Sequence, residues 1–143
     1  MPRKRYILTD RAASDLREAR AWSRARWGKD LTNRYFDDLH DGAQYIAEHH
    51  ASLRGRHDLA GGTALLLHAV REHYLVYEPL DEQHVVIVAV VRQRRDIPAI
   101  LQKWAAPIRR ELIEIRAAIE SGKIRLPMKR ADAKPLKKRR KTT

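Results

Sequence analysis

Residues 84–91 constrain the fold of this chain more than any other segment, because six of these eight residues are β-branched. β-branched side chains favour extended structure. A strand without polar alternation has both of its faces buried. We therefore expect this strand to lie at the centre of a sheet, between a helical layer and a second covered surface.

Three further segments complete the expected sheet. Residues 5–8 are short and β-prone, residues 64–70 are apolar, and residues 72–77 are rich in β-forming side chains. Residues 79–83, which begin with a proline, are expected to form a turn before the central strand. The segments predict a small antiparallel sheet.

A helical hairpin is expected between the first strand and the others. Thr9 or Asp10 can cap the first helix, because a side-chain oxygen there can accept from the free amides of the first turn. Gly28 ends that helix, and a second helix runs over residues 29–50. Apolar positions recur every three or four residues: Ala12, Leu16, Ala19 and Trp22 or Ser23 in the first helix, and Leu31, Tyr35, Leu39, Gly42 or Ala43 and Ile46 in the second. The short break between the helices predicts antiparallel packing.

A last helix is expected to begin at Pro107, which suits the first helical position, and to end at Gly122. Residues 97–101 are expected to form one short turn. The apolar side chains of the helix are spaced four, three and four residues apart: Ile108, Leu112, Ile115 and Ile119. This stripe favours packing on the helix's own domain. Pairing with a second copy or with a partner helix is the alternative.

The positive charge is concentrated at the end of the chain. The net charge is +12, yet residues 122–143 alone hold ten Lys and Arg against one acid. Like charges repel within this segment and few apolar groups can be buried, so we expect a disordered tail. The tail either keeps the protein in solution or tethers it to nucleic acid through Lys137, Lys138, Arg139, Arg140 and Lys141.

Several classes of site are excluded or disfavoured. The chain has no cysteine, so disulfides and thiolate metal sites cannot form. No apolar run approaches the roughly 20 residues of a membrane helix, and no secretion signal follows the basic N-terminus. The adjacent His49 and His50 point to different sides of a helix, so we expect no metal site. Without a glycine-rich phosphate loop, we expect no cofactor. A cytoplasmic protein without membrane contact is expected.

A basic cluster at the end of the central strand is the concentrated candidate for function. Arg92, Arg94 and Arg95 emerge there, followed by Asp96. Three guanidiniums cannot all be buried unpaired. They either form an ion pair with an acid such as Asp96 or bind the phosphates or carboxylates of a partner.

The preceding strand adds aromatic groups beside this cluster. Tyr74 and Tyr77 are an odd number of residues apart, so they should face opposite sides of the sheet. We expect one of them in the core. The other, if exposed beside the arginines, can stack on a base or anchor a peptide. His73 shares the face of Tyr77 if no bulge intervenes.

Five segments resemble, in the same order, motifs of the RelE/ParE superfamily of bacterial type II toxin–antitoxin toxins. They are the opening motif at residues 8–16, the helix break at 27–28, the start of the second helical stripe at 34–35, the H-x-(I/L)-x-Y strand at 73–77, and the closing V-L-H-x-R-x-D motif at 90–96. The resemblance implies an α+β toxin domain over residues 1–104. A C-terminal helix (105–122) and the basic tail (123–143) would follow.

Two activities are known in this superfamily. RelE-like members cut mRNA on the ribosome, whereas ParE-like members poison DNA gyrase. Arg92 replaces the histidine of the closing motif, and no tyrosine follows Tyr77. The resemblance therefore favours a gyrase inhibitor over an enzyme. The alternative is a ribosome-dependent nuclease with Tyr77, Arg92, Arg94 and Arg95 at the scissile phosphate. A non-toxic, basic nucleic-acid-binding module is a third reading.

The resemblance also implies a partner. An acidic, partly disordered antitoxin would fold across the sheet and the helical hairpin and neutralise the toxin. The residues expected to bind this antitoxin or the target are His73, Tyr77, Arg92, Arg94, Arg95 and Asp96. A homodimer and a toxin–antitoxin hetero-oligomer are both compatible with the sequence.

Overall fold

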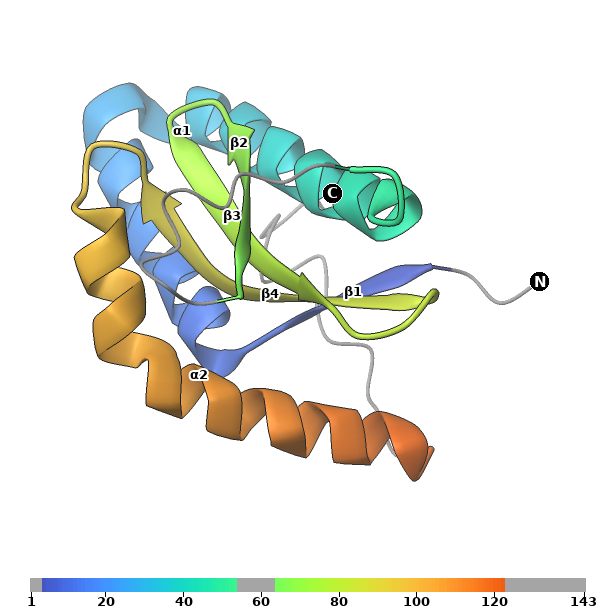
Figure 1. The fold of residues 1–143 in the computed structure, drawn as a ribbon. Coiled ribbons are helices and arrows are strands. Elements are labelled where there is room, and N and C mark those ends of the chain that lie inside the picture. Colours follow the sequence, from blue (N-terminus) through green and yellow to red (C-terminus); the bar gives the residue numbers. More distant parts are fainter. Residues whose placement is uncertain (1–3, 54–63, 123–143) are drawn as a thin grey trace.

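The computed structural model describes residues 4–53 and 64–122 of the chain. The predicted tail, with its basic residues 137–141, lies outside the described residues. Figure 1 shows an α+β fold, as predicted. Its elements in chain order are β1 (Arg5–Leu8), α1 (Asp10–His49), β2 (Leu66–Val70), β3 (His73–Pro79), β4 (His84–Arg92) and α2 (Ile97–Glu120).

The four strands form one sheet in the order β1-β4-β3-β2. As predicted, β2, β3 and β4 are antiparallel neighbours. The first strand pairs in parallel with β4, with Arg5 opposite His84, so the sheet is mixed. A parallel pair requires a long crossover connection, and α1, β2 and β3 together provide it.

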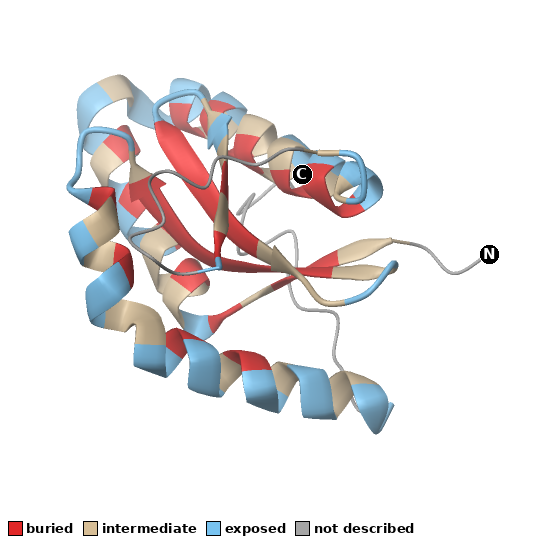
Figure 2. Ribbon diagram, in the orientation of Figure 1, coloured by how far each residue is buried: buried red, intermediate tan, exposed pale blue. Residues whose placement is uncertain are grey.

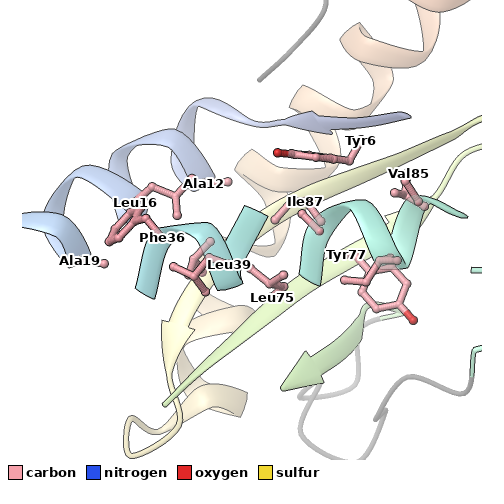
Figure 3. Close-up of a cluster of buried hydrophobic side chains, with 14 of the residues drawn as sticks. Tyr6, Ala12, Leu16, Ala19, Phe36, Leu39, Leu75, Tyr77, Val85 and Ile87 are labelled. Carbon is pink, nitrogen blue, oxygen red and sulfur yellow. The ribbon is translucent and has the colours of Figure 1, made fainter. Parts of the chain in front are cut away.

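The central strand β4 is buried on both faces, as its composition predicts (Figure 2). One set of its side chains joins the core beneath α1, which Figure 3 shows around Ile87 and Val85. The other set, including Val86 and Val91, joins a second core beneath α2. The pairing with β3 shifts by one residue between Val76 and Tyr77, so β4 carries a bulge.

The helix α1 is a hairpin of two helical segments. Gly28 interrupts it with φ +83° and ψ −179°, a backbone conformation found almost only at glycine. The two segments fold back on each other. Arg20 of the first donates to Asn33 of the second at 3.4 Å, and its guanidinium lies over the ring of Phe36. The predicted hairpin is therefore confirmed.

One position of the second helical stripe was predicted wrongly. Leu31 is 49% exposed, and the neighbouring Thr32 is buried in its place. Thr32 can be buried because its hydroxyl donates to the carbonyl of Gly28 at 2.7 Å. The break at Gly28 thus fixes which side of the following turn faces inwards.

The last helix begins ten residues earlier than predicted, at Ile97 rather than at Pro107. Asp96 caps it by accepting from the amide of Ala99 at 3.3 Å. Pro107 lies inside the helix, and α2 bends along its length in Figure 1, as expected where a backbone donor is missing. The division of the chain at residue 104 stays a prediction, and it falls within this continuous helix.

The apolar stripe of α2 packs on the helix's own domain, as favoured by the sequence. Ile108 and Leu112 are buried against the second face of the sheet. The helix is also attached to the start of α1, because the carboxylate of Glu111 accepts from the amide of Asp10 at 2.6 Å. None of the helices in the described part of the chain is long and apolar enough to span a membrane.

Candidate functional site

Three segments that are distant in sequence meet at one end of the molecule. They are the bend of α1, the turn between β2 and β3, and the loop between β4 and α2, at the upper left of Figure 1. Together they line a hollow of about 560 Å³. We call its basic and aromatic lining residues the Trp22 cluster: Trp22, Arg26, Arg71, Arg92 and Arg94.

The indole of Trp22 organises the cluster. The guanidinium carbon of Arg92 lies 4.8 Å from the centroid of this ring, and that of Arg26 lies 5.0 Å from it. Trp27 packs its ring edge-to-face against Trp22, with the centroids 5.1 Å apart. Cation–π contacts of this kind favour one position for each guanidinium. Trp22 therefore holds two cationic side chains beside the hollow.

Hydrogen bonds from Gln93 hold the loop after β4 against the turn between β2 and β3. The Gln93 side-chain amide donates to the carbonyls of Arg71, at 2.8 Å, and His73, at 3.2 Å. The Gln93 backbone amide donates to the carbonyl of Glu72 at 3.0 Å. Arg71 has φ +53° and forms an ion pair with Asp38 of α1. The arginines of the cluster thus stand on a well-braced backbone.

His73 lies beneath the cluster as a buried, neutral group. Its Nδ1 is 2.5 Å from the hydroxyl of Tyr35, and the same hydroxyl accepts from the amide of Glu72 at 3.1 Å. Burial and the nearby Arg92 lower the pKa of His73 to about 4. Burial also raises the pKa of Tyr35 to about 12. At neutral pH the imidazole is therefore uncharged, and it shares a hydrogen bond with the tyrosine hydroxyl.

Tyr77 does not lie with the arginines. Its side chain is fully buried in the core shown in Figure 3, and its strand partner is Ile87. Tyr74 joins the opposite core, so the two tyrosines face opposite sides, as predicted. Neither tyrosine is exposed beside the arginines, because helices cover both faces of the sheet.

Of the two alternatives for the arginines, the ion pair with Asp96 is not observed in the described part of the chain. Asp96 caps α2, and no ion pair within the described residues joins it to Arg92, Arg94 or Arg95. Arg92 and Arg94 belong to the Trp22 cluster, and Arg95 lines an adjacent hollow with Arg92. The structure therefore brings the three arginines and His73 together and places Tyr77 elsewhere.

Sequence reasoning missed three residues of this site. Trp22 was expected only in the helical stripe, and Arg26 and Arg71 were not expected to contribute. The spacing of Trp22 and Arg26 did contain a signal, because residues four apart lie side by side on a helix. Arg71 comes from a turn whose position depends on the whole sheet, so no local pattern reveals it.

Comparison with known proteins places the chain in a family. The model of the ParE toxin of the type II toxin–antitoxin system, parDE, matches residues 6–97. A solved chain of the chromosomal ParDE system from P. aeruginosa has a similar fold, with a TM-score of 0.54 and 12% sequence identity. That match covers 62% of this chain and 95% of the solved one. No curated protein matches the sequence. Since the family match spans more than half of the residues, the chain belongs to the ParE toxin family of type II toxin–antitoxin systems.

Proposed function

We propose that this toxin inhibits DNA gyrase and that an acidic antitoxin neutralises it. The Trp22 cluster is the observation that carries the proposal. One hollow is lined by Arg26, Arg92 and Arg94. Among the described residues, none of these three arginines forms an ion pair with a carboxylate. Unpaired guanidiniums bind carboxylates and phosphates through charge-assisted hydrogen bonds. The cluster is thus suited to binding an acidic surface.

The positions of the other candidate residues favour binding over RNA cleavage. A nuclease needs an acid and a base within hydrogen-bonding reach of the reacting atoms. Tyr77 is buried in the core, and the Nδ1 atom of His73 is occupied by Tyr35. The ribosome-dependent nuclease therefore loses its proposed tyrosine, and family membership also favours a toxin over a non-toxic binding module.

The structure changes the expected antitoxin surface. An antitoxin cannot spread over a bare sheet face, because α1 and α2 already cover the two faces of the sheet. The Trp22 cluster and the outer side of α1 remain accessible. We infer that the acidic segment of the antitoxin reaches the arginines of the cluster directly.

A gyrase assay tests the proposed target. The full chain is added in stoichiometric excess to gyrase and relaxed plasmid, and we expect loss of supercoiling with accumulation of cleaved DNA. The double variant R92Q/R94Q should weaken this inhibition by at least about tenfold. The matched control R109Q/R110Q removes the same charge from exposed positions on α2. Unaffected gyrase, together with codon-specific mRNA cuts on translating ribosomes, would refute the proposal.

A growth assay tests the partner. Expression of the chain alone should arrest growth, and co-expression of the neighbouring reading frame should restore it. If the neighbour encodes an acidic protein that forms a complex with the wild-type chain, the complex should weaken in R92Q/R94Q. A complex of unchanged affinity would mean that the antitoxin binds a different surface.

A further inference from the structure

We propose that the Trp22 cluster is a binding site for the phosphate backbone of duplex DNA. Four guanidiniums and one carboxylate, that of Glu72, line this hollow. Asp38 neutralises Arg71, which leaves three guanidiniums available to a ligand. A basic surface of this kind is the electrostatic footprint of a nucleic-acid site, and it belongs to the folded domain rather than to the tail.

The stacking on Trp22 suits these arginines to phosphate. A cation–π contact uses the face of the ring, and the N–H groups that are not turned towards the ring stay free for a second ligand. Arg26 and Arg92 both lie over the indole. They are therefore held in place before the ligand arrives, and less side-chain freedom is lost on binding.

The same stacking favours duplex DNA over a single strand. Proteins bind single-stranded nucleic acid largely by stacking bases on aromatic rings. The ring of Trp22 is already covered by guanidiniums, and Tyr35 and Tyr77 are buried. A duplex keeps its bases stacked inside and presents its phosphates, so it needs no free aromatic ring.

The composition of the hollow also resembles that of a DNA-binding surface. Tight protein partners anchor large apolar or aromatic side chains in the core of an interface. Apart from Trp22, the hollow is lined only by charged or amide side chains, four of them arginines. Polar, strongly positive surfaces are typical of protein–DNA interfaces. This inference goes beyond the proposed gyrase target, and duplex binding is measured without gyrase or antitoxin, so the two proposals can fail separately.

The test measures binding of the full chain to a fluorescently labelled 20-base-pair duplex by anisotropy across a salt series. Each phosphate contact contributes about 0.9 to the slope of log K against log salt concentration. The variant R26Q/R92Q should reduce the slope by nearly two and weaken binding at least about tenfold. The control R109Q/R110Q removes an equal charge from exposed positions on α2 and should change both quantities much less.

Three results would overturn the proposal. Equal losses in the two double variants would show that only overall charge matters. Tighter binding of the matching single strand, lost in R26Q/R92Q, would indicate base stacking. If R26Q/R92Q bound a glutamate-rich peptide more weakly than the wild-type chain but bound the duplex equally well, the cluster would be assigned to a protein partner. Circular dichroism and thermal melting confirm that each variant is folded. The variant R26K/R92K should lose only part of the duplex affinity, because lysine keeps the charge but lacks the planar guanidinium.

Discussion

At the residue scale, the buried pair of Tyr35 and His73 lies beneath the arginines of the Trp22 cluster. The imidazole is only 2% exposed, and its Nδ1 is hydrogen-bonded to the Tyr35 hydroxyl of α1. A positive charge on this ring would lie close to Arg92 in a poorly hydrated place. The neutral ring therefore connects the helical hairpin to β3 without adding repulsion beneath the cluster.

This buried imidazole predicts a pH-dependent stability. The pKa of His73 is lowered from 6.5 to about 4 in the folded chain, so between these values the unfolded chain binds the additional proton. Stability should therefore fall as pH decreases, by about 2 kcal/mol between pH 7 and pH 4.5 from this group. Urea unfolding at the two pH values measures the effect. The variant H73Q should lack this contribution, and an equal pH dependence in both proteins would contradict the assignment.

Single residues also show which roles can be predicted from sequence. Thr9 or Asp10 was expected to cap α1, and the structure selects Thr9, whose hydroxyl oxygen accepts from the amide of Ala12 at 3.0 Å. The same hydroxyl donates to the carbonyl of Val88 at 2.9 Å. The cap is a local pattern of neighbouring residues, whereas the bond to β4 depends on a strand that is distant in sequence. Likewise, the Asp15 carboxylate accepts from the amide of Val90 at 2.9 Å. This bond also reaches β4 and could not be predicted from neighbouring residues.

At the scale of the elements, the break in α1 determines the geometry of the basic site. Trp22 and Arg26 precede Gly28, whereas Tyr35 and Asp38 follow it and contact Arg71. The reversal at Gly28 therefore brings both sides of the hairpin to the same end of the sheet. The sequence indicated this reversal, because a glycine separated two apolar stripes.

We expect the substitution G28A to destabilise the fold. A side chain at φ +83° and ψ −179° is strained, at a cost of about 1–3 kcal/mol. An added Cβ would meet no atom within 4 Å, so the loss would come from the backbone alone. Thermal or urea unfolding measures it. An unchanged midpoint would mean that the hairpin forms with a different turn.

The start of α2 shows where element prediction failed. Proline is common in the first turn of a helix, so Pro107 was taken as the helix start. Asp96 and Pro98 provide the real start, and burial of Leu101 and Ile108 on the same sheet face holds the helix together across Pro107. Tertiary packing therefore decided between two local signals of similar strength.

At the scale of the whole molecule, the sheet lies between two helical layers of different origin. The hairpin α1 comes early in the chain and lies within the part matched by the ParE family model, which ends at residue 97. Nearly all of α2 lies beyond that point, yet it covers the second core. The need for two covering layers could be predicted from β4. The stripe of α2 favoured packing on its own domain, but a partner helix remained the alternative until the structure placed α2 on the sheet.

Truncation of side chains on α2 tests whether this second layer is integral to the fold. L112A removes a buried side chain and should reduce stability by about 2–5 kcal/mol. I113A is the matched control on the adjacent, 64% exposed position, and should change stability by less than about 0.5 kcal/mol. Chemical unfolding of both variants measures the difference. Equal, small effects would show that α2 is only loosely attached.

The parallel pairing of β1 with β4 has a consequence for synthesis of the protein. The first strand emerges from the ribosome early, but its partner residues, 84–87, follow only after most of the domain has been made. The second core then waits for residues 97–112 to arrive. A ribosome that stops short of these residues releases a chain with apolar surface uncovered, which is a substrate for proteases and chaperones rather than a shortened toxin. Folding of the domain is thus tied to its nearly complete translation.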